Sequence, residues 1–165
     1  MNQLEKIFLD ELADTLHAEN MLVKALPKMR DAALSPELKG LFDGHLAETR
    51  EHVARLETIF RSFDLPAREK KCEGMLGLLM EGQHLMQRYK PSAALDAALV
   101  CAARKIENFE TVSYSSLAKW ASALAADDAA AILDETLKEE EKLVKKLGQI
   151  GARVLRREAS MEKAA

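Results

Sequence analysis

Apolar residues recur along most of this chain in steps of three and four, the spacing that places side chains on one face of an α-helix. In the first such segment the apolar stripe passes through Leu12, Leu22 and Leu26. Four long segments show the pattern: residues 2–33, 36–63, 92–124, and 127 or 128 onward into the polar C-terminal end. A helix with one apolar face buries that face against other helices. The pattern therefore predicts four amphipathic helices around a shared core.

The lengths of the connections predict how these helices are arranged. Short turns around Ser35 and around residues 125–127 join the first segment to the second and the third to the fourth, so each pair is expected to form an antiparallel hairpin. Between the hairpins lies a longer stretch, residues 64–91, with a shorter helical pattern over 73–87. Two hairpins joined by one long crossover are typical of a ferritin-like arrangement. We therefore predict an all-α, ferritin-like four-helix bundle.

Composition agrees with a single helical domain. The chain has 165 residues, 48% of them apolar, but only 7 Gly and 4 Pro. Such a mixture favours helices over a β-sandwich or a disordered chain, and the length suits one core. We expect one domain over residues 1–160 and a polar tail over 161–165.

Charge and hydropathy restrict the partners. The net charge of -3 argues against a nucleic-acid partner, which normally requires a strongly basic surface. No apolar run approaches the roughly 20 residues that cross a bilayer. The acidic N-terminal segment is not typical of a secretory signal, and Cys72 and Cys101 stand alone. We expect a cytoplasmic protein that binds neither nucleic acid nor membrane, and the sequence does not identify a protein partner.

Ionisable side chains interrupt all four apolar stripes. Carboxylates and histidines occur at positions that the helical period places on or beside the core-facing side. These candidates are Glu19 in the first segment, His45, Glu48 and His52 in the second, Glu107 and Glu110 in the third, and Glu135 and Glu139 in the fourth. Buried carboxylates are unfavourable unless they are protonated or paired with cations. Two divalent metal ions would supply that charge, and oxygen ligands suit iron or manganese.

The heights of the carboxylates along the bundle narrow the set. Glu19 and Glu48 lie almost equally far from the first turn, and Glu110 and Glu139 lie almost equally far from the second. These four residues are therefore the expected inner set, and Glu107, Glu135, His45 and His52 are the next candidates. The alternative for any one position is a glutamate that reaches solvent or pairs with Lys or Arg.

Several segments resemble a known family. HAENMLVKALPKM, SPELKGLFDGHLAETREHVARLE and ILDETLKEEEKLVKKL are similar to sequences of the YciF/YciE-like family of ferritin-like bacterial stress proteins, and the similarity extends over about residues 4–150. The resemblance implies a homodimer with a dinuclear site in its core and a link to general or oxidative stress. The matching positions are Glu19, His45, Glu48, Glu107, Glu110, Glu135 and Glu139. The Glu-x-x-His motif of ferritins is absent at Glu48 and at Glu135, so the histidine ligand stays open between His45 and His52.

The function expected from these features is that of a dimetal-carboxylate protein in stress defence. Two metal ions are expected, iron foremost with manganese or zinc as alternatives, and the protein would oxidise or sequester iron. One alternative is a non-catalytic helical interaction protein with a vestigial or structural metal site. Another is a metal-buffering protein without turnover.

Overall fold

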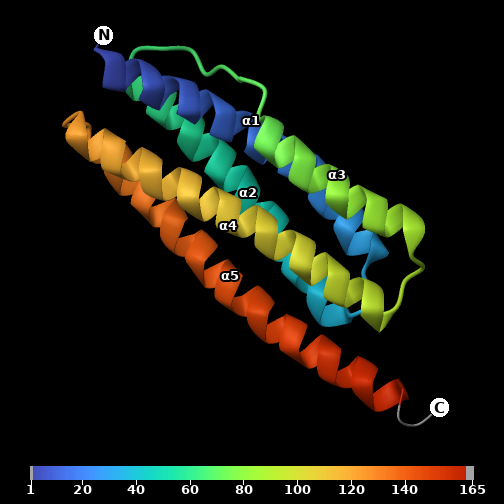
Figure 1. Ribbon diagram of the computed structural model, residues 1–165. Coiled ribbons are helices and arrows are strands. Elements are labelled where there is room, and N and C mark those ends of the chain that lie inside the picture. Colours follow the sequence, from blue (N-terminus) through green and yellow to red (C-terminus); the bar gives the residue numbers. More distant parts are fainter. Residues whose placement is uncertain (1, 163–165) are drawn as a thin grey trace.

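The computed structural model describes residues 2–162, and this part of the chain folds into helices without strands. The helices are α1 (Gln3–Ala32), α2 (Pro36–Ser62), α3 (Glu73–Arg88), α4 (Ala93–Ala123) and α5 (Asp127–Glu162). Figure 1 shows α1 and α2 as one antiparallel hairpin and α4 and α5 as the other, with the crossover helix α3 beside α1 and α4. The prediction of a ferritin-like bundle of two hairpins with a helical crossover is confirmed.

Capping residues mark the N-termini of α1, α2 and α4. Asn2 accepts a hydrogen bond from the Glu5 backbone N–H, and the Glu5 carboxylate accepts one from the Asn2 N–H, which forms a capping box on α1. Ser35 caps α2 ahead of Pro36, and Ser92 caps α4. These caps place the helix starts within about a residue of where sequence reasoning expects them.

A buried carboxylate joins the two hairpins at one end of the bundle. Asp96, in the first turn of α4, accepts hydrogen bonds from the backbone N–H groups of Leu34 (2.7 Å) and Ser35 (2.8 Å) in the turn between α1 and α2. Its side chain is 2% exposed. These charge-assisted bonds satisfy backbone donors that the turn leaves without helical partners.

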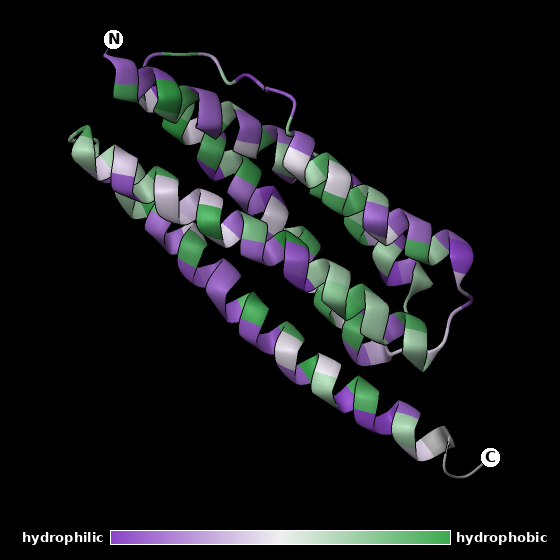
Figure 2. Cartoon of the chain, in the orientation of Figure 1, coloured by the Kyte–Doolittle hydropathy of each residue, from purple (hydrophilic) through white to green (hydrophobic). Residues whose placement is uncertain are grey.

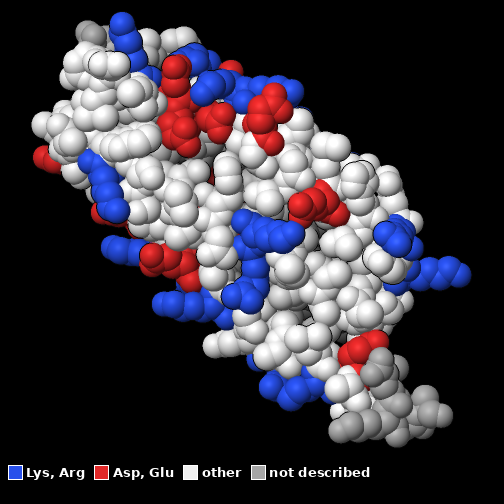
Figure 3. All heavy atoms as spheres, viewed as in Figure 1, with Lys and Arg blue, Asp and Glu red and all other residues white. Residues whose placement is uncertain are grey.

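The C-terminal helix is longer than expected. α5 continues through Glu162, whereas the sequence predicts a polar tail over 161–165; residues 163–165 of that tail lie outside the described residues. None of the described helices has the length and apolar character that a membrane span requires. On the face seen in Figure 3, acidic and basic side chains are both spread across the surface.

The apolar core is divided into two clusters. One lies near the turn between α1 and α2 and includes Leu22, Leu99 and Leu147. The other lies near the opposite end and includes Leu12 and Leu133. Figure 2 shows hydrophobic and hydrophilic residues alternating along each helix, as amphipathic packing requires. Between the clusters, the middle turns of α1, α2, α4 and α5 carry buried polar side chains, and these form the candidate site.

Candidate metal centre

Six ionisable side chains are buried together at mid-height in the bundle, each at most 2% exposed. They are Glu19 of α1, His45 and His52 of α2, Glu107 and Glu110 of α4, and Glu140 of α5. Charged groups are rarely so deeply buried unless they are paired or coordinate metal. All four bundle helices contribute to this layer, which is therefore the candidate functional site.

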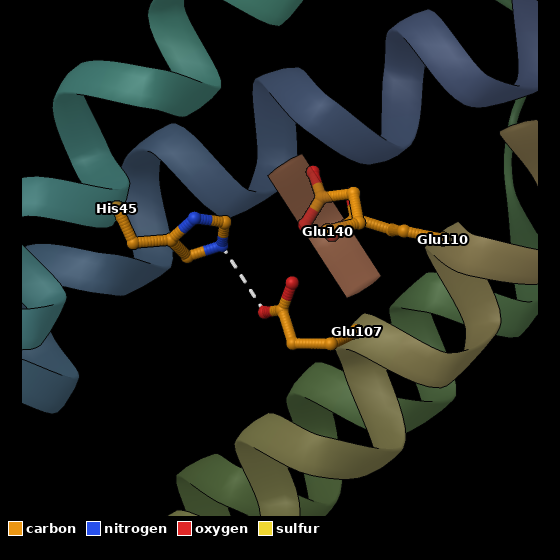
Figure 4. Close-up of side chains that lie close together, drawn as sticks. All are labelled: His45, Glu107, Glu110 and Glu140. Atoms are coloured by element: carbon orange, nitrogen blue, oxygen red, sulfur yellow. Dashed lines mark ion pairs between the residues drawn. The ribbon is translucent and has the colours of Figure 1, made fainter. Parts of the chain in front are cut away.

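The first group of ligand atoms comes from α2, α4 and α5. One ligand atom each of His45, Glu107, Glu110 and Glu140 lies within 4.8 Å of the others. Figure 4 shows these four side chains pointing toward one another, with His45 Nε2 3.1 Å from a Glu107 oxygen. A nitrogen and three carboxylates at this spacing form a donor set that suits iron, manganese or zinc.

The second group is centred on His52. Its Nδ1 atom lies 3.3 Å from Oε1 of Glu19 and 3.0 Å from Oε1 of Glu140. Ligand atoms of Glu19, His52 and Glu140 lie within 4.8 Å of one another. Glu140 belongs to both groups and is the carboxylate that they share.

Many of these polar atoms have no hydrogen-bond partner within residues 2–162. They include both carboxylate oxygens of Glu110 and of Glu140, both ring nitrogens of His45, and Nδ1 of His52. An unsatisfied buried polar group costs about 1–3 kcal/mol, so native proteins leave few of them. Four buried carboxylates carry the charge that two divalent ions neutralise. The arrangement therefore fits a pair of metal ions.

Without metal, the pKa values of the buried groups are shifted by burial and by one another. Burial raises the pKa of Glu110 well above its usual range, and the charges of Glu19 and Glu140 raise it further. Burial alone would lower the pKa of His52, but the close carboxylates of Glu140 and Glu19 outweigh it and raise the pKa to about 10. His52 therefore holds a proton near neutral pH when the layer contains no metal ion.

A second carboxylate lies behind each histidine. The Glu139 Oε2 atom is 2.9 Å from His52 Nε2, on the side of the ring opposite Glu140, and it accepts a hydrogen bond of 2.6 Å from Arg55. Glu48 lies 3.9 Å from His45 Nδ1. Carboxylates in this position orient a ligating imidazole and select its tautomer. Glu139 therefore fixes His52 with Nδ1 directed into the site.

A tyrosine orients the carboxylate on α1. The Tyr114 hydroxyl donates a hydrogen bond to Oε1 of Glu19, and its ring lies edge-on to His52 with centroids 6.0 Å apart. Burial raises the pKa of Tyr114 well above its usual range, so the hydroxyl keeps its proton.

The structure sorts the sequence candidates into inner and outer positions. Glu19, Glu107, Glu110, His45 and His52 lie in the buried layer. The expectation that Glu48 and Glu139 face the core is wrong: their side chains are 54% and 33% exposed. Glu135 is 63% exposed and pairs with Arg55 outside the core. Glu140, which sequence reasoning left out, lies at the centre of the site.

The predicted positions Glu139 and Glu48 each differ by one residue from the position that is buried. Stepping back from Leu147 by four and three through Leu143 leads to Glu140 and not to Glu139, and Glu140 lies on the buried face. On α2 the buried position is Thr49, so Glu48 is rotated by about 100° out of the core. A step of four back from Leu143 leads instead to Glu139, so the spacing of the following apolar residues does not by itself distinguish the two glutamates.

The fold and the buried layer define a ferritin-like helical bundle with a candidate carboxylate–histidine metal centre. Residues 3–160 match the model of a family described as a domain of unknown function (DUF892), and the chain belongs to that family. The chain is 36% identical over 141 residues to protein YciF of Escherichia coli, a match that covers 85% of each chain.

Two solved structures place the fold among its relatives. The crystal structure of the E. coli stress protein YciF matches with a TM-score of 0.90 and 34% identity, and it covers 94% of this chain and 99% of that one. A structure from Bacillus anthracis described as ferritin-like, diiron-carboxylate proteins matches with a TM-score of 0.71, covering 91% and 99%. At 12% identity, that second likeness shows the fold alone.

Proposed function

We propose that this chain binds two divalent metal ions and handles iron as a stress protein. His45, Glu107 and Glu110 would hold one ion, Glu19 and His52 the other, and Glu140 would bridge them. The observation that carries the proposal is the buried layer of ionisable atoms without hydrogen-bond partners in the described chain. The metal would supply the cationic charge that the four carboxylates require.

Iron is the metal that we propose, with manganese and zinc as competitors for the same ligands. Carboxylates with one imidazole per ion suit all three metals, so the donor atoms alone do not select one. The relative from B. anthracis is described as a diiron-carboxylate protein, and the E. coli relative is described as a stress protein. The first description agrees with iron handling here, and the second agrees with a role in stress.

The chain's own residues would set the conditions for oxidation of Fe(II). Iron, when bound, would supply one-electron chemistry with oxygen or peroxide as the acceptor. The two apolar clusters exclude bulk water from the layer. Glu139 would keep His52 oriented, and Tyr114 would hold Glu19 through its hydrogen bond.

We further propose that the chain acts in the cytoplasm as a homodimer. Sedimentation equilibrium at micromolar protein tests the dimer, which a single species of monomer mass would contradict.

Iron uptake and oxygen consumption test the proposed function. Chelator-stripped protein is mixed anaerobically with about two equivalents of Fe(II), and oxygen or peroxide is then added while oxidant consumption and Fe(III) absorbance are recorded. We expect consumption to depend on the wild-type chain and to be lost in Glu140→Gln but kept in the exposed control Glu135→Gln. Metal binding without consumption would leave a metal-buffering role. Absence of binding would favour the non-catalytic helical module, whose buried layer stays neutral by holding protons.

A further inference from the structure

A polar pocket of about 250 Å³ opens between α2 and α5 beside the candidate metal centre. Gly40, Gly44 and Glu48 line it from α2, and Glu139 and Leu143 line it from α5, with His45 contributing to its wall. His45 is also a member of the buried group with Glu107, Glu110 and Glu140. The pocket and the metal centre therefore share a side chain.

The two glycines keep this gap open. Gly40, Gly44 and Glu48 are spaced by four, so they lie along one face of α2. A Cβ atom built on either glycine meets no other atom within 4 Å. No close approach to α5 therefore requires glycine at these positions. Glycine is also unfavourable inside a helix, so helix formation does not explain it either. What the glycines provide is empty space in front of α5.

His45 connects the gap to the buried ligands. Its side chain is 2% exposed, and neither ring nitrogen makes a hydrogen bond within the described residues. One nitrogen, Nδ1, lies 3.9 Å from Glu48 at the pocket, and the other, Nε2, lies 3.1 Å from Glu107 in the buried layer. Only the His45 ring thus separates an ion at Glu48 from the first group of ligands.

We propose that this pocket is the route by which divalent metal ions reach the buried centre, with Glu48 as the first oxygen ligand that they meet. The inference rests on the proposed metal-binding function and adds the path to it. Glu139 lines the same pocket but is held by Arg55, which leaves Glu48 as the freer carboxylate. Lys142 and Lys146 also line the pocket and are exposed, so their charges oppose the approach of a cation.

Stopped-flow uptake of Co²⁺ tests the route, because Co²⁺ bound by histidine and carboxylates has visible absorption. Gly44→Leu fills the gap without a backbone clash and replaces glycine with a better helix former. We expect it to slow the association by about tenfold or more while the final spectrum and stoichiometry stay those of the wild type. The matched control is Gly77→Leu, since Gly77 is also helical and its Cβ would also meet nothing within 4 Å.

Two exposed charge variants test the same route without filling it. Glu48→Gln should slow Co²⁺ association and Lys142→Gln should speed it, so that the two rates differ by about fivefold at low salt and converge at high salt. Equal rates for these two variants, or a Gly44→Leu rate equal to that of Gly77→Leu, would overturn the route. A wild-type chain that takes up no Co²⁺ would overturn the proposed function and the route with it, whereas normal uptake with unchanged variant rates overturns the route alone.

Discussion

The Nδ1 atom of His52 lies 3.0 Å from Oε1 of Glu140, and both side chains are only 1% exposed. On the other side of the same ring, Nε2 lies 2.9 Å from Oε2 of Glu139. Two adjacent glutamates of α5 therefore approach one histidine of α2 from opposite sides. Glu140 reaches the ring from the core, and Glu139 reaches it from the surface, where Arg55 holds it. A metal ion would lie on the Glu140 side.

Substitutions along α5 should separate these two roles. Glu140→Gln removes the carboxylate shared by both ligand groups, so we expect tight binding of the ion pair to be lost. Glu139→Gln leaves both groups intact but weakens the support of His52, so we expect binding of two ions with affinity lowered by about 10- to 100-fold. Competition with a chromophoric chelator measures both effects.

The adjacent Glu141 provides the control for this series. It is exposed, so Glu141→Gln changes the same charge on the same helix without touching the buried layer. Wild-type affinity is expected for this variant. Equal losses in the variants at 139, 140 and 141 would mean that only the net charge matters, which contradicts the assignment of Glu140 as the bridge.

Metal affinity should rise with pH. In the metal-free layer the pKa of His52 is raised to about 10, and burial raises that of Glu107 to about 8, so both hold protons near neutral pH. Ions have to displace those protons, and fewer remain to be displaced as the pH increases. We expect binding to release protons and to tighten from about pH 6 to about pH 9. Calorimetry in two buffers of different ionisation enthalpy counts the protons; an enthalpy independent of the buffer would contradict the expectation.

Without metal, the buried layer should lower the stability of the fold. Neither oxygen of Glu110 has a hydrogen-bond partner in the described chain, so Glu110→Leu should increase the free energy of unfolding of the chelator-treated protein by about 1–3 kcal/mol. Glu107→Leu should give a smaller gain, because it also removes the carboxylate that forms an ion pair with His45. Urea unfolding with chelator present measures both. A Glu110→Leu variant less stable than wild type would show that the layer has partners beyond those described.

Most of the fold could be predicted from the sequence because each signal for it is local. The caps at Ser35 and Ser92 and the step of three and four fix where helices begin and which face is apolar. The short turns then determine the hairpins. The extension of α5 to Glu162 was missed because polar residues continue a helix as readily as they end it when no Gly or Pro follows.

The site was harder to predict because it depends on helical phase. Glu19 and Glu110 lie midway along stripes with apolar residues on both sides, so their burial follows from the period. On α5, Glu139 and Glu140 are adjacent, and a shift of one residue turns a side chain by about 100°. The partner of α5 across the core, which the sequence does not give, decides between them.

Anomalous diffraction from crystals grown with Fe(II) or Co(II) tests the central claim most directly. The expected result is two peaks about 3.5–4 Å apart. One should lie among His45, Glu107, Glu110 and Glu140, and the other among Glu19, His52 and Glu140. The absence of peaks in this layer, or peaks confined to exposed carboxylates such as Glu135, would contradict the account.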